Sequence, residues 1–233
     1  MIELNNVTLA AVSCVKHIQT IKALLFSSRQ IKFKKTIFIT DVEKKDITIK
    51  CDNIDFIPCP EPIKSKDDYS IFMLKKFKDY IDTDFVLLVQ YDGFVLNPVL
   101  WRDEWLKYDY VGAPFPPFYF NRENPSQLVR VGNGGFSLRS RRFINLFSDL
   151  NLPIIRDQLT GIAEDHQQCC MYHSTFLENG IKYAPVEEAV KFSHENFTHT
   201  PEVKKEITPF GFHVCRGYQG EDIYDNFYYP YFA

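Results

Sequence analysis

The sequence predicts an α/β fold built on one mixed, mostly parallel sheet that is flanked by helices. The run from Phe85 to Val89 has five apolar residues without a polar break. Such a short run, rich in branched side chains, is typical of a strand buried on both faces of a parallel sheet. Strand-like and helix-like segments alternate over roughly the first ninety residues, which favours right-handed crossovers. The length of 233 residues suffices for one large domain with a full core.

Local spacing predicts the individual elements. Apolar runs predict strands at residues 7–14, 36–41, 52–58 and 85–89, and helical spacing predicts helices at residues 17–26, 67–80, 101–107, 141–150 and 164–178. Asp67 and Asp68 begin the second helix, where the helix dipole favours anions. Its apolar stripe consists of Ile71, Leu74 and Phe77. No repeat, linker or change in composition marks a domain boundary, so we expect a single domain over residues 1–233.

Composition excludes several classes of partner. The net charge of −3 provides no basic field for nucleic acid or for an anionic membrane surface. Aromatic residues reach 15% of the chain, and their rings stack well on sugars and bases. The sequence contains no Cys-x-x-Cys pair, so a structural zinc site has little support. Cys169 and Cys170 are adjacent, which is typical of buried thiols in a reducing compartment. We find no signal peptide and no apolar run near roughly 18 residues, so we expect a cytoplasmic protein without a transmembrane segment.

The segment Gln90-Tyr91-Asp92-Gly93 directly follows the strand at 85–89. The carboxyl ends of strands in open α/β sheets are where ligands collect. An ionised Asp92 at this position is costly to bury unless a cation or hydrogen-bond donors meet it. Asp-Gly is also a common turn dipeptide, so the segment alone is equally consistent with a turn and with a ligand site.

Three further features carry possible chemistry, each with a structural alternative. The glycine loop Gly132-Asn133-Gly134-Gly135 allows backbone to approach a ligand, but a hairpin or bulge would use the same residues. The pair Glu164-Asp165 places two carboxylates at a predicted helix start, where helix capping explains one of them. His213 lies alone in an aromatic stretch, which is typical of a packed core histidine.

In their order and spacing, these features resemble the glycosyltransferases of the GT-A fold. The closest resemblance is to a poorly characterised family of small glycosyltransferase-like proteins, which share a Gln-x-Asp-Gly strand end and a Gly-Asn-Gly-Gly-Phe-Ser-Leu-Arg loop. It covers about residues 7–213 and is strongest over residues 85–166. The resemblance implies a GT-A-like single domain with Mn²⁺ or Mg²⁺, which bridges the diphosphate of a nucleotide-sugar donor.

The resemblance also implies roles for particular residues. Asp92 corresponds to the last acid of the Asp-x-Asp element and His213 to the C-terminal metal ligand. Gln90 replaces the first acid, which implies a weaker metal site or a ribose contact. Asp165 corresponds to the catalytic base of inverting members, with Glu164 as its helper. Donor and acceptor contacts are implied, partly by position alone, for Ser13, Asp41, Gln90, Tyr91, Gly93, Asn133, Gly134 and Gly135.

The function expected from the sequence is metal-dependent transfer of a sugar, with inversion, from a nucleotide-diphosphate sugar to a hydroxyl acceptor. UDP is the preferred nucleotide, and the acceptor can be a glycan, a lipid-linked group or a protein. The alternative is a non-catalytic domain that binds nucleotide sugars or carbohydrate, and Gln90 favours it. A nucleotidyltransferase is disfavoured because no basic glycine-rich loop follows the first strand. If Asp92 and His213 bind one ion, their side chains should lie within about 5 Å of each other.

Overall fold

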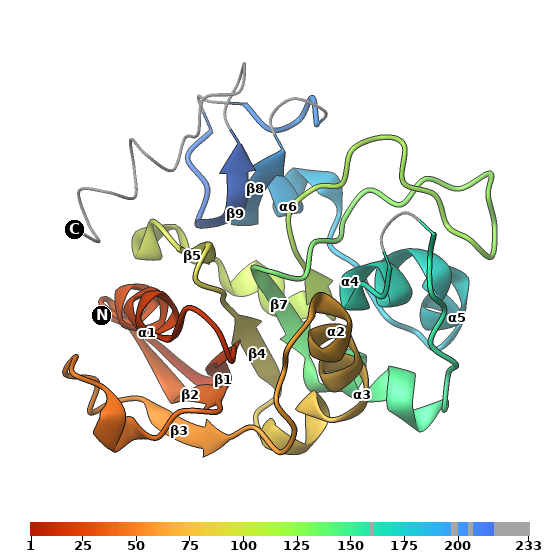
Figure 1. Cartoon of the computed structure of the whole chain (residues 1–233). Coiled ribbons are helices and arrows are strands. Elements are labelled where there is room, and N and C mark those ends of the chain that lie inside the picture. The colour runs from red at the N-terminus through yellow and green to blue at the C-terminus, as the bar shows by residue number, and fades with distance from the viewer. Residues whose placement is uncertain (159–160, 197–199, 205–206, 217–233) are drawn as a thin grey trace.

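The computed structural model describes residues 1–158, 161–196, 200–204 and 207–216, with the side chains of 196 and 214–216 left aside (Figure 1). The strands are β1 (Ile2–Val12), β2 (Ile31–Thr40), β3 (Asp55–Pro58), β4 (Phe85–Leu88), β5 (Gly93–Val95), β6 (Tyr110–Val111), β7 (Ser137–Ser140), β8 (Ser193–Asn196) and β9 (Gly211–Arg216). The α-helices are α1 (His17–Ser27), α2 (Lys66–Lys75), α3 (Arg141–Asp149), α4 (Glu164–His166), α5 (His173–Glu178) and α6 (Val186–Phe192). Short 3₁₀ helices span Lys44–Asp46, Phe77–Tyr80, Pro98–Leu100 and Asp103–Lys107, and a π-helical turn spans Gln167–Met171.

The main sheet has six strands in the order β3-β2-β1-β4-β7-β6. The first four of these strands are parallel, with β1 pairing to β2 on one side and to β4 on the other. Strand β7 runs antiparallel to β4, and β6 runs antiparallel to β7. The predicted mixed, mostly parallel sheet is therefore confirmed, and β4 is an inner strand as its unbroken apolar run predicted.

The main sheet is covered on both faces. Along β1, Leu9 and Ala11 join one hydrophobic core with residues of α1, whereas Ala10 and Val12 join a second core with residues of α2 and α3. All four side chains are almost fully buried. Successive side chains on a strand point to opposite faces, so a strand with no polar alternation must have cover on each side.

Some predicted boundaries were wrong. Strand β1 begins at Ile2 instead of residue 7, and β2 begins at Ile31 instead of residue 36, because their first residues pair with each other even though polar side chains alternate there. The helix expected at 101–107 is a 3₁₀ helix over Asp103–Lys107. The helix expected at 164–178 is divided into α4, a π-helical turn and α5, with a non-helical residue at Tyr172.

The second helix also differs in its buried face. Ser65 caps α2 by accepting a hydrogen bond from the Asp68 amide at 3.1 Å, and the helix ends at Lys75 before a 3₁₀ turn. Ile71 was expected in the apolar stripe but is 40% exposed, while Phe72 and Met73 are buried. The helix packs against both the sheet and α3, so its buried face is broader and rotated from the one that spacing predicted.

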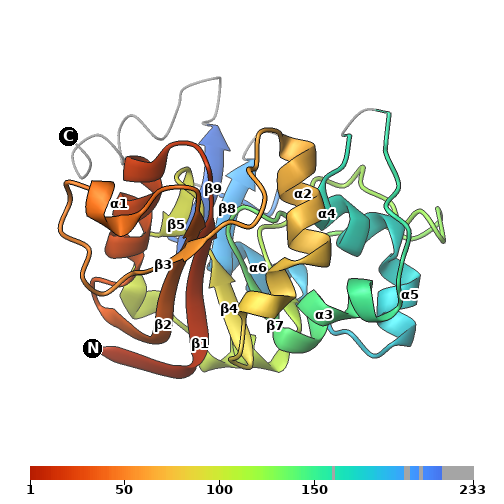
Figure 2. The ribbon, with the colours of Figure 1, turned by 60° about the horizontal axis from the view of Figure 1, so that its bottom comes forward.

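A second, three-stranded sheet joins distant parts of the chain in the order β5-β9-β8. Strand β5 follows the turn after β4, and Gly93 is paired directly with His213 on β9. The blue strands β8 and β9 lie just beyond the end of β4 (Figure 2). This small sheet therefore brings the C-terminal segment to the carboxyl edge of the main sheet. Within the described ranges, no helix combines the length and apolar character that crossing a membrane requires.

Candidate active site

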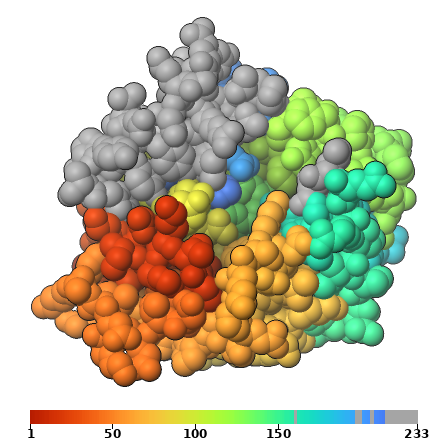
Figure 3. Space-filling view, in the orientation of Figure 1, coloured from red at the N-terminus to blue at the C-terminus, as the bar shows by residue number. Residues whose placement is uncertain are grey.

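The segment after β4 is a tight turn. The Gln90 amide donates to the Gly93 carbonyl at 2.8 Å, and the Gly93 amide donates to the Gln90 carbonyl at 3.1 Å. The turn interpretation is thus confirmed, and it does not exclude a ligand, because the turn presents Asp92 at the carboxyl edge of an inner strand. In the space-filling view, yellow, green and blue atoms lie recessed between the red and orange half of the chain and the teal helices (Figure 3).

His213 faces this turn. Its Nε2 lies 3.8 Å from Oδ1 of Asp92, and its Nδ1 lies 3.1 Å from Oε1 of Glu195. The expected proximity of Asp92 and His213 is therefore observed. Burial lowers the pKa of His213, but the hydrogen bond to Glu195 and the charges of Glu195 and Asp92 outweigh it, so the pKa lies above its usual value.

The glycine loop is packed against the protein's own side chains. A Cβ atom at Gly135 would lie 2.0 Å from Nε2 of His213, and one at Gly134 would lie 2.1 Å from Oε1 of Glu164. A Cβ at Gly93 would lie 2.8 Å from Cδ2 of His213. These positions need glycine so that the histidine and the buried glutamate can approach the backbone. The sequence predicted that a ligand would approach the glycine backbone closely, whereas in the structure the side chains of His213 and Glu164 do so.

Asp165 lies in α4 and contacts the same loop. Its Oδ2 accepts a hydrogen bond from the Gly134 amide at 2.9 Å, and its Oδ1 accepts one from the His166 amide at 2.8 Å. The side chain stays partly exposed, and each carboxylate oxygen retains further acceptor capacity. The carboxylate therefore joins the glycine loop to the start of α4 and still offers a proton acceptor.

Arg139 and Glu164 form a buried ion pair behind this loop. The Nη2 atom of Arg139 lies 2.7 Å from Oε1 of Glu164 and donates to the Gly134 carbonyl at 3.1 Å. Burial raises the pKa of Glu164 to about 7, although the charge of Arg139 opposes this shift. Because Glu164 is almost fully buried, it can act on Asp165 only by positioning the loop and by its charge.

Asn133 begins the loop in a left-handed conformation, with φ of 71°. Its carbonyl accepts a hydrogen bond from the Tyr110 hydroxyl at 2.7 Å, and its Oδ1 accepts one from the Gly135 amide at 3.1 Å. Its buried Nδ2 has no acceptor within the described part of the chain. Asn133 thus fixes the loop and keeps one donor that a sugar hydroxyl or phosphate oxygen could use.

The other residues of the turn have defined partners. The side-chain amide of Gln90 donates to the Tyr69 hydroxyl at 3.0 Å. Tyr91 is 38% exposed. Burial, the charge of Asp92 and a hydrogen bond to Asp92 raise the pKa of Tyr91.

Ser13 and Asp41 lie further along the same carboxyl edge. The Ser13 amide donates to the Ile39 carbonyl at 3.0 Å, and its hydroxyl donates to the Val15 carbonyl. Oδ1 of Asp41 lies 2.8 Å from Nε2 of His17, the first residue of α1. Both residues are therefore at the ends of β1 and β2, as predicted, and the Asp41 side chain is hydrogen-bonded to His17.

The ligand atoms that Asp92 and His213 offer fit a divalent cation only in part. Three or more His, Cys, Asp or Glu side chains do not gather into a possible metal site anywhere among the described residues. A carboxylate and an imidazole are suitable donors for Mn²⁺ or Mg²⁺, and such sites commonly complete their shell with water and phosphate. Glu195 bonded to Nδ1 is the arrangement that directs the other ring nitrogen toward a metal.

Sequence reasoning missed three residues of this site. Glu195 follows a buried histidine on β8 and lies 18 positions from His213, so no local spacing connects them. Arg139 was part of the quoted loop motif but received no role, because β7 begins and ends with serine and no apolar run indicates that the arginine is buried. Tyr69 lies on α2, and nothing in its sequence surroundings links it to Gln90.

Solved structures identify the fold of this chain. The galactosyltransferase LgtC, in complex with donor and acceptor sugar analogs, superposes with a TM-score of 0.55 at 10% identity, over 97% of this chain and 95% of LgtC. The apo form of the glycosyltransferase GlyE from Streptococcus pneumoniae TIGR4 gives a TM-score of 0.51 at 13% identity, over 92% of this chain and 55% of GlyE. The fold is therefore GT-A-like, as the resemblance implied.

The family follows from the sequence itself. Residues 53–213 match the family described as "Protein of unknown function (DUF5672)", and the chain belongs to that family. No curated protein sequence gives a significant match. The matched region ends at His213 and includes the turn, the glycine loop and the paired carboxylates.

Proposed function

We propose that this protein is a glycosyltransferase that transfers a sugar from a nucleotide-diphosphate sugar, preferably a UDP-sugar, to a hydroxyl of an acceptor. The observation that carries the proposal is the approach of His213 to Asp92 at 3.8 Å beside the glycine loop that binds Asp165. These residues are contributed by four separate segments of a GT-A-like fold. A set of polar groups that meets from distant segments at the carboxyl edge of a sheet is typical of a ligand site.

Asp92 and His213 would hold Mn²⁺ or Mg²⁺, with Glu195 orienting the imidazole. The bound cation would supply compensation for the negative charge that develops on the leaving nucleotide diphosphate. Gln90, held by Tyr69, stands where a second acid would add charge, so the affinity for the cation depends on donor phosphates more than on the protein.

Asp165 would take the proton of the acceptor hydroxyl as that hydroxyl attacks the anomeric carbon. A carboxylate within hydrogen-bond reach of the hydroxyl can do so. Hydrogen bonds from the Gly134 and His166 amides fix the orientation of this carboxylate. Direct attack by the acceptor with a base on its side of the sugar gives inversion at the anomeric carbon.

A second candidate function is a non-catalytic domain that binds nucleotide sugars or carbohydrate. It is favoured by Gln90 in place of an acid and by the use of both Asp165 oxygens as acceptors of backbone amides, which is what a structural carboxylate does. In that case Asp165 would only join the glycine loop to α4.

The two functions separate in one assay. Purified protein is incubated with UDP-, GDP-, CMP- and dTDP-sugars and Mn²⁺, with and without a chelator, and release of the nucleotide is measured. We expect release from one class of donor that stops when the chelator is added and in Asp165→Asn. Binding of a donor without its hydrolysis or transfer would instead support the non-catalytic domain.

A further inference from the structure

Residues 112–131 form a long, ordered loop between β6 and the glycine loop. Two isolated bridges pair its arms, one between Pro114 and Val131 and one between Phe120 and Leu128. The Phe115 amide donates to the Arg130 carbonyl at 2.8 Å, which closes the base of the loop. The loop therefore has a fixed shape and leads directly into the backbone that binds Asp165.

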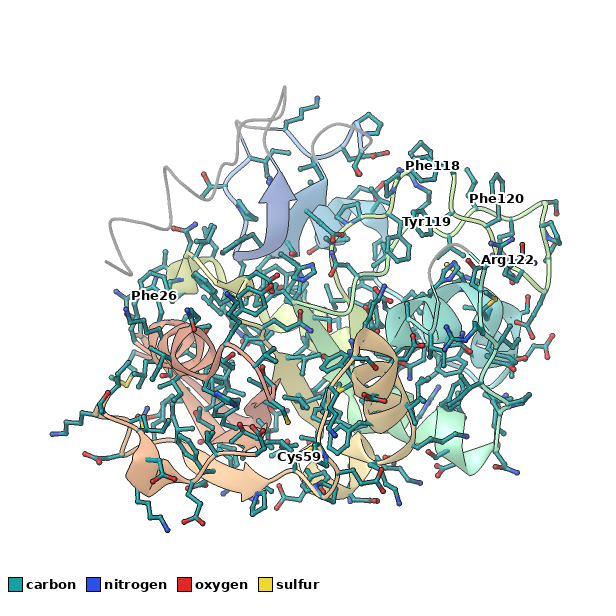
Figure 4. The ribbon with its side chains drawn as sticks, in the orientation of Figure 1. Phe26, Cys59, Phe118, Tyr119, Phe120 and Arg122 are labelled. Atoms are coloured by element: carbon teal, nitrogen blue, oxygen red, sulfur yellow. The ribbon has the colours of Figure 1, made fainter. Side chains whose placement is uncertain are left out.

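Aromatic rings follow one another along this loop (Figure 4). Phe115 and Tyr119 stack with centroids 4.3 Å apart and planes 15° apart. Tyr119 and Phe118 stack at 5.4 Å and 26°. Phe115 is 6% exposed whereas Phe118 is 57% exposed, so the row of three rings runs from the core to the solvent. Phe120, two positions beyond Phe118, is 43% exposed.

The row passes close to the candidate base. The ring of Tyr119 meets the ring of His166, the residue after Asp165, edge to face at 5.9 Å. Burial raises the pKa of Tyr119, and the charges of Asp165 and Glu195 raise it further. The exposed end of the row is thus connected to the site through a single ring.

The arms of the loop are hydrogen-bonded to α5 and to the π-helical turn that precedes it. The buried side chain of Asn121 donates to Gln127 Oε1 at 2.9 Å and to Ser174 Oγ at 2.7 Å. The Arg122 amide donates to the Cys170 carbonyl at 2.8 Å. The backbone that carries the exposed rings is consequently held in place by these hydrogen bonds, and such preorganisation lowers the entropic cost of binding.

We propose that Phe118, Tyr119 and Phe120 form the acceptor subsite and that the acceptor is a saccharide stacked on these rings. This inference rests on the proposed glycosyltransferase function. A sugar ring has an apolar face of C–H groups and a rim of hydroxyls, so it needs an open aromatic face with polar groups beside it. Asn124, Ser126 and Gln127 lie at the tip and returning arm of the same loop. The Ser126 hydroxyl donates to Oδ1 of Asn124 at 2.7 Å and Gln127 Oε1 accepts from Asn121, so the amide nitrogens of Asn124 and Gln127 are the groups proposed for that rim.

The charges of the loop favour a saccharide over a lipid surface. Both of its arginines have acidic partners, since Arg130 binds both oxygens of Glu202 at 2.9 Å and Arg122 lies 3.4 Å from Asp157. The loop contains no lysine. An amphipathic surface that binds anionic membranes carries unpaired basic residues around its apolar groups, and this loop lacks such a cluster.

The test measures saccharide binding without any donor. Tetrasaccharides of glucose, galactose, mannose and N-acetylglucosamine are screened by saturation-transfer NMR, and those that bind are titrated by calorimetry. The variants are Phe118→Ala and Phe120→Ala. The matched controls are Leu150→Ala and Ile155→Ala, whose native side chains are 39% and 40% exposed on other parts of the surface.

We expect at least one tetrasaccharide to bind and its affinity to fall roughly 5- to 10-fold in Phe118→Ala, as the loss of one stacked ring predicts. The controls should bind as the wild type does, and melting temperatures identify any variant that fails to fold. The absence of binding by every tetrasaccharide, or equal binding by Phe118→Ala, would overturn the proposal. Ring-dependent capture by vesicles of phosphatidylcholine and phosphatidylglycerol, in place of saccharide binding, would overturn it too.

The glycosyltransferase function and the saccharide subsite are tested by separate measurements. Release of the nucleotide, by hydrolysis or by transfer, is measured independently of Phe118, so its absence with every donor and every bound saccharide would contradict the transferase. Saccharide binding that depends on Phe118, in a protein without donor hydrolysis, would support the saccharide site and assign it to a non-catalytic carbohydrate-binding protein.

Discussion

Two Asp–His pairs lie on the carboxyl edge of the main sheet, and they differ in geometry. Asp41 and His17 are 2.8 Å apart, with side chains 42% and 27% exposed. Asp92 and His213 are 3.8 Å apart, with side chains 21% and 15% exposed. The first pair makes a direct hydrogen bond, whereas the second is too far apart for one.

The difference indicates which pair can accept a cation. Two ligands that each lie roughly 2.0–2.4 Å from one ion are themselves roughly 3–4.5 Å apart, which the second pair matches. Glu195 also holds the Nδ1 atom of His213, while His17 has its Nε2 occupied by Asp41. The same two residue types thus form a direct hydrogen bond at one strand end and a wider, open pair at the next.

The largest effect is expected at the carboxylate beside the open pair. Asp165→Asn removes the proton acceptor, so turnover should fall about 10²- to 10⁴-fold while donor affinity stays nearly constant. Initial rates and donor titration on the same preparation measure this.

Asp68→Asn is the matched control, since Asp68 also accepts a backbone amide near a helix start, at 3.1 Å from the Lys64 nitrogen. If both variants lose about 1 kcal/mol of stability and neither loses activity, Asp165 is a structural cap.

The ion pair behind the glycine loop is expected to dominate stability. Arg139→Met leaves Glu164 buried without its partner, which should cost about 3–5 kcal/mol in the free energy of unfolding by urea. Arg142→Met is the control, because Arg142 is 54% exposed and lies 3.9 Å from Asp109. An exposed pair of this kind contributes about 0–1 kcal/mol. Equal losses in the two variants would show that the buried pair does not hold the loop.

The small sheet that carries the open pair should be sensitive to acid. Burial lowers the pKa of His194 on β8 to about 4, although a hydrogen bond with the Val190 backbone opposes the shift. The unfolded chain takes up this proton near its ordinary pKa of about 6.5, so stability is lost as pH falls from about 6.5 to about 4. The loss should reach at most about 3 kcal/mol.

His194→Gln cannot take up the proton and should flatten the dependence of unfolding free energy on pH between about 4 and 7. The residual slope would come in part from His166 and His173, because burial lowers the pKa of both. An unchanged slope in the variant would mean that His194 is solvated in solution.

A smaller effect is expected from the residue that orients His213. Glu195→Gln keeps the shape of the side chain but weakens its hold on Nδ1, so Mn²⁺ affinity should fall about 10- to 100-fold. Glu202→Gln removes a carboxylate that binds Arg130 instead and should leave Mn²⁺ affinity unchanged. Equal affinities in both variants, measured by calorimetry, would remove Glu195 from the site.

The two Asp–His pairs also show what sequence reasoning can reach. The strand before Asp92 was predictable because burial on both faces leaves a local signal, an apolar run without alternation. Its partner His213 was assigned through family resemblance, and only the pairing of Gly93 with His213 explains the approach physically. Glu195 lies 18 positions from His213 and Arg139 lies 25 positions from Glu164. Contacts between such separate elements depend on the whole fold, so neither could be placed by local spacing. The starts of β1 and β2 were missed because exposed polar side chains alternate with apolar ones there, so no unbroken apolar run marks them.

The most direct test is calorimetric titration with MnCl₂ of the wild type and of variants in both pairs. Asp92→Asn and His213→Gln should each lower Mn²⁺ affinity at least about 10-fold, because each removes one of two protein ligands. Asp41→Asn and His17→Gln should bind Mn²⁺ as the wild type does. Wild-type Mn²⁺ affinity in Asp92→Asn, or a loss confined to Asp41→Asn, would contradict the assignment of the cation to the Asp92–His213 pair.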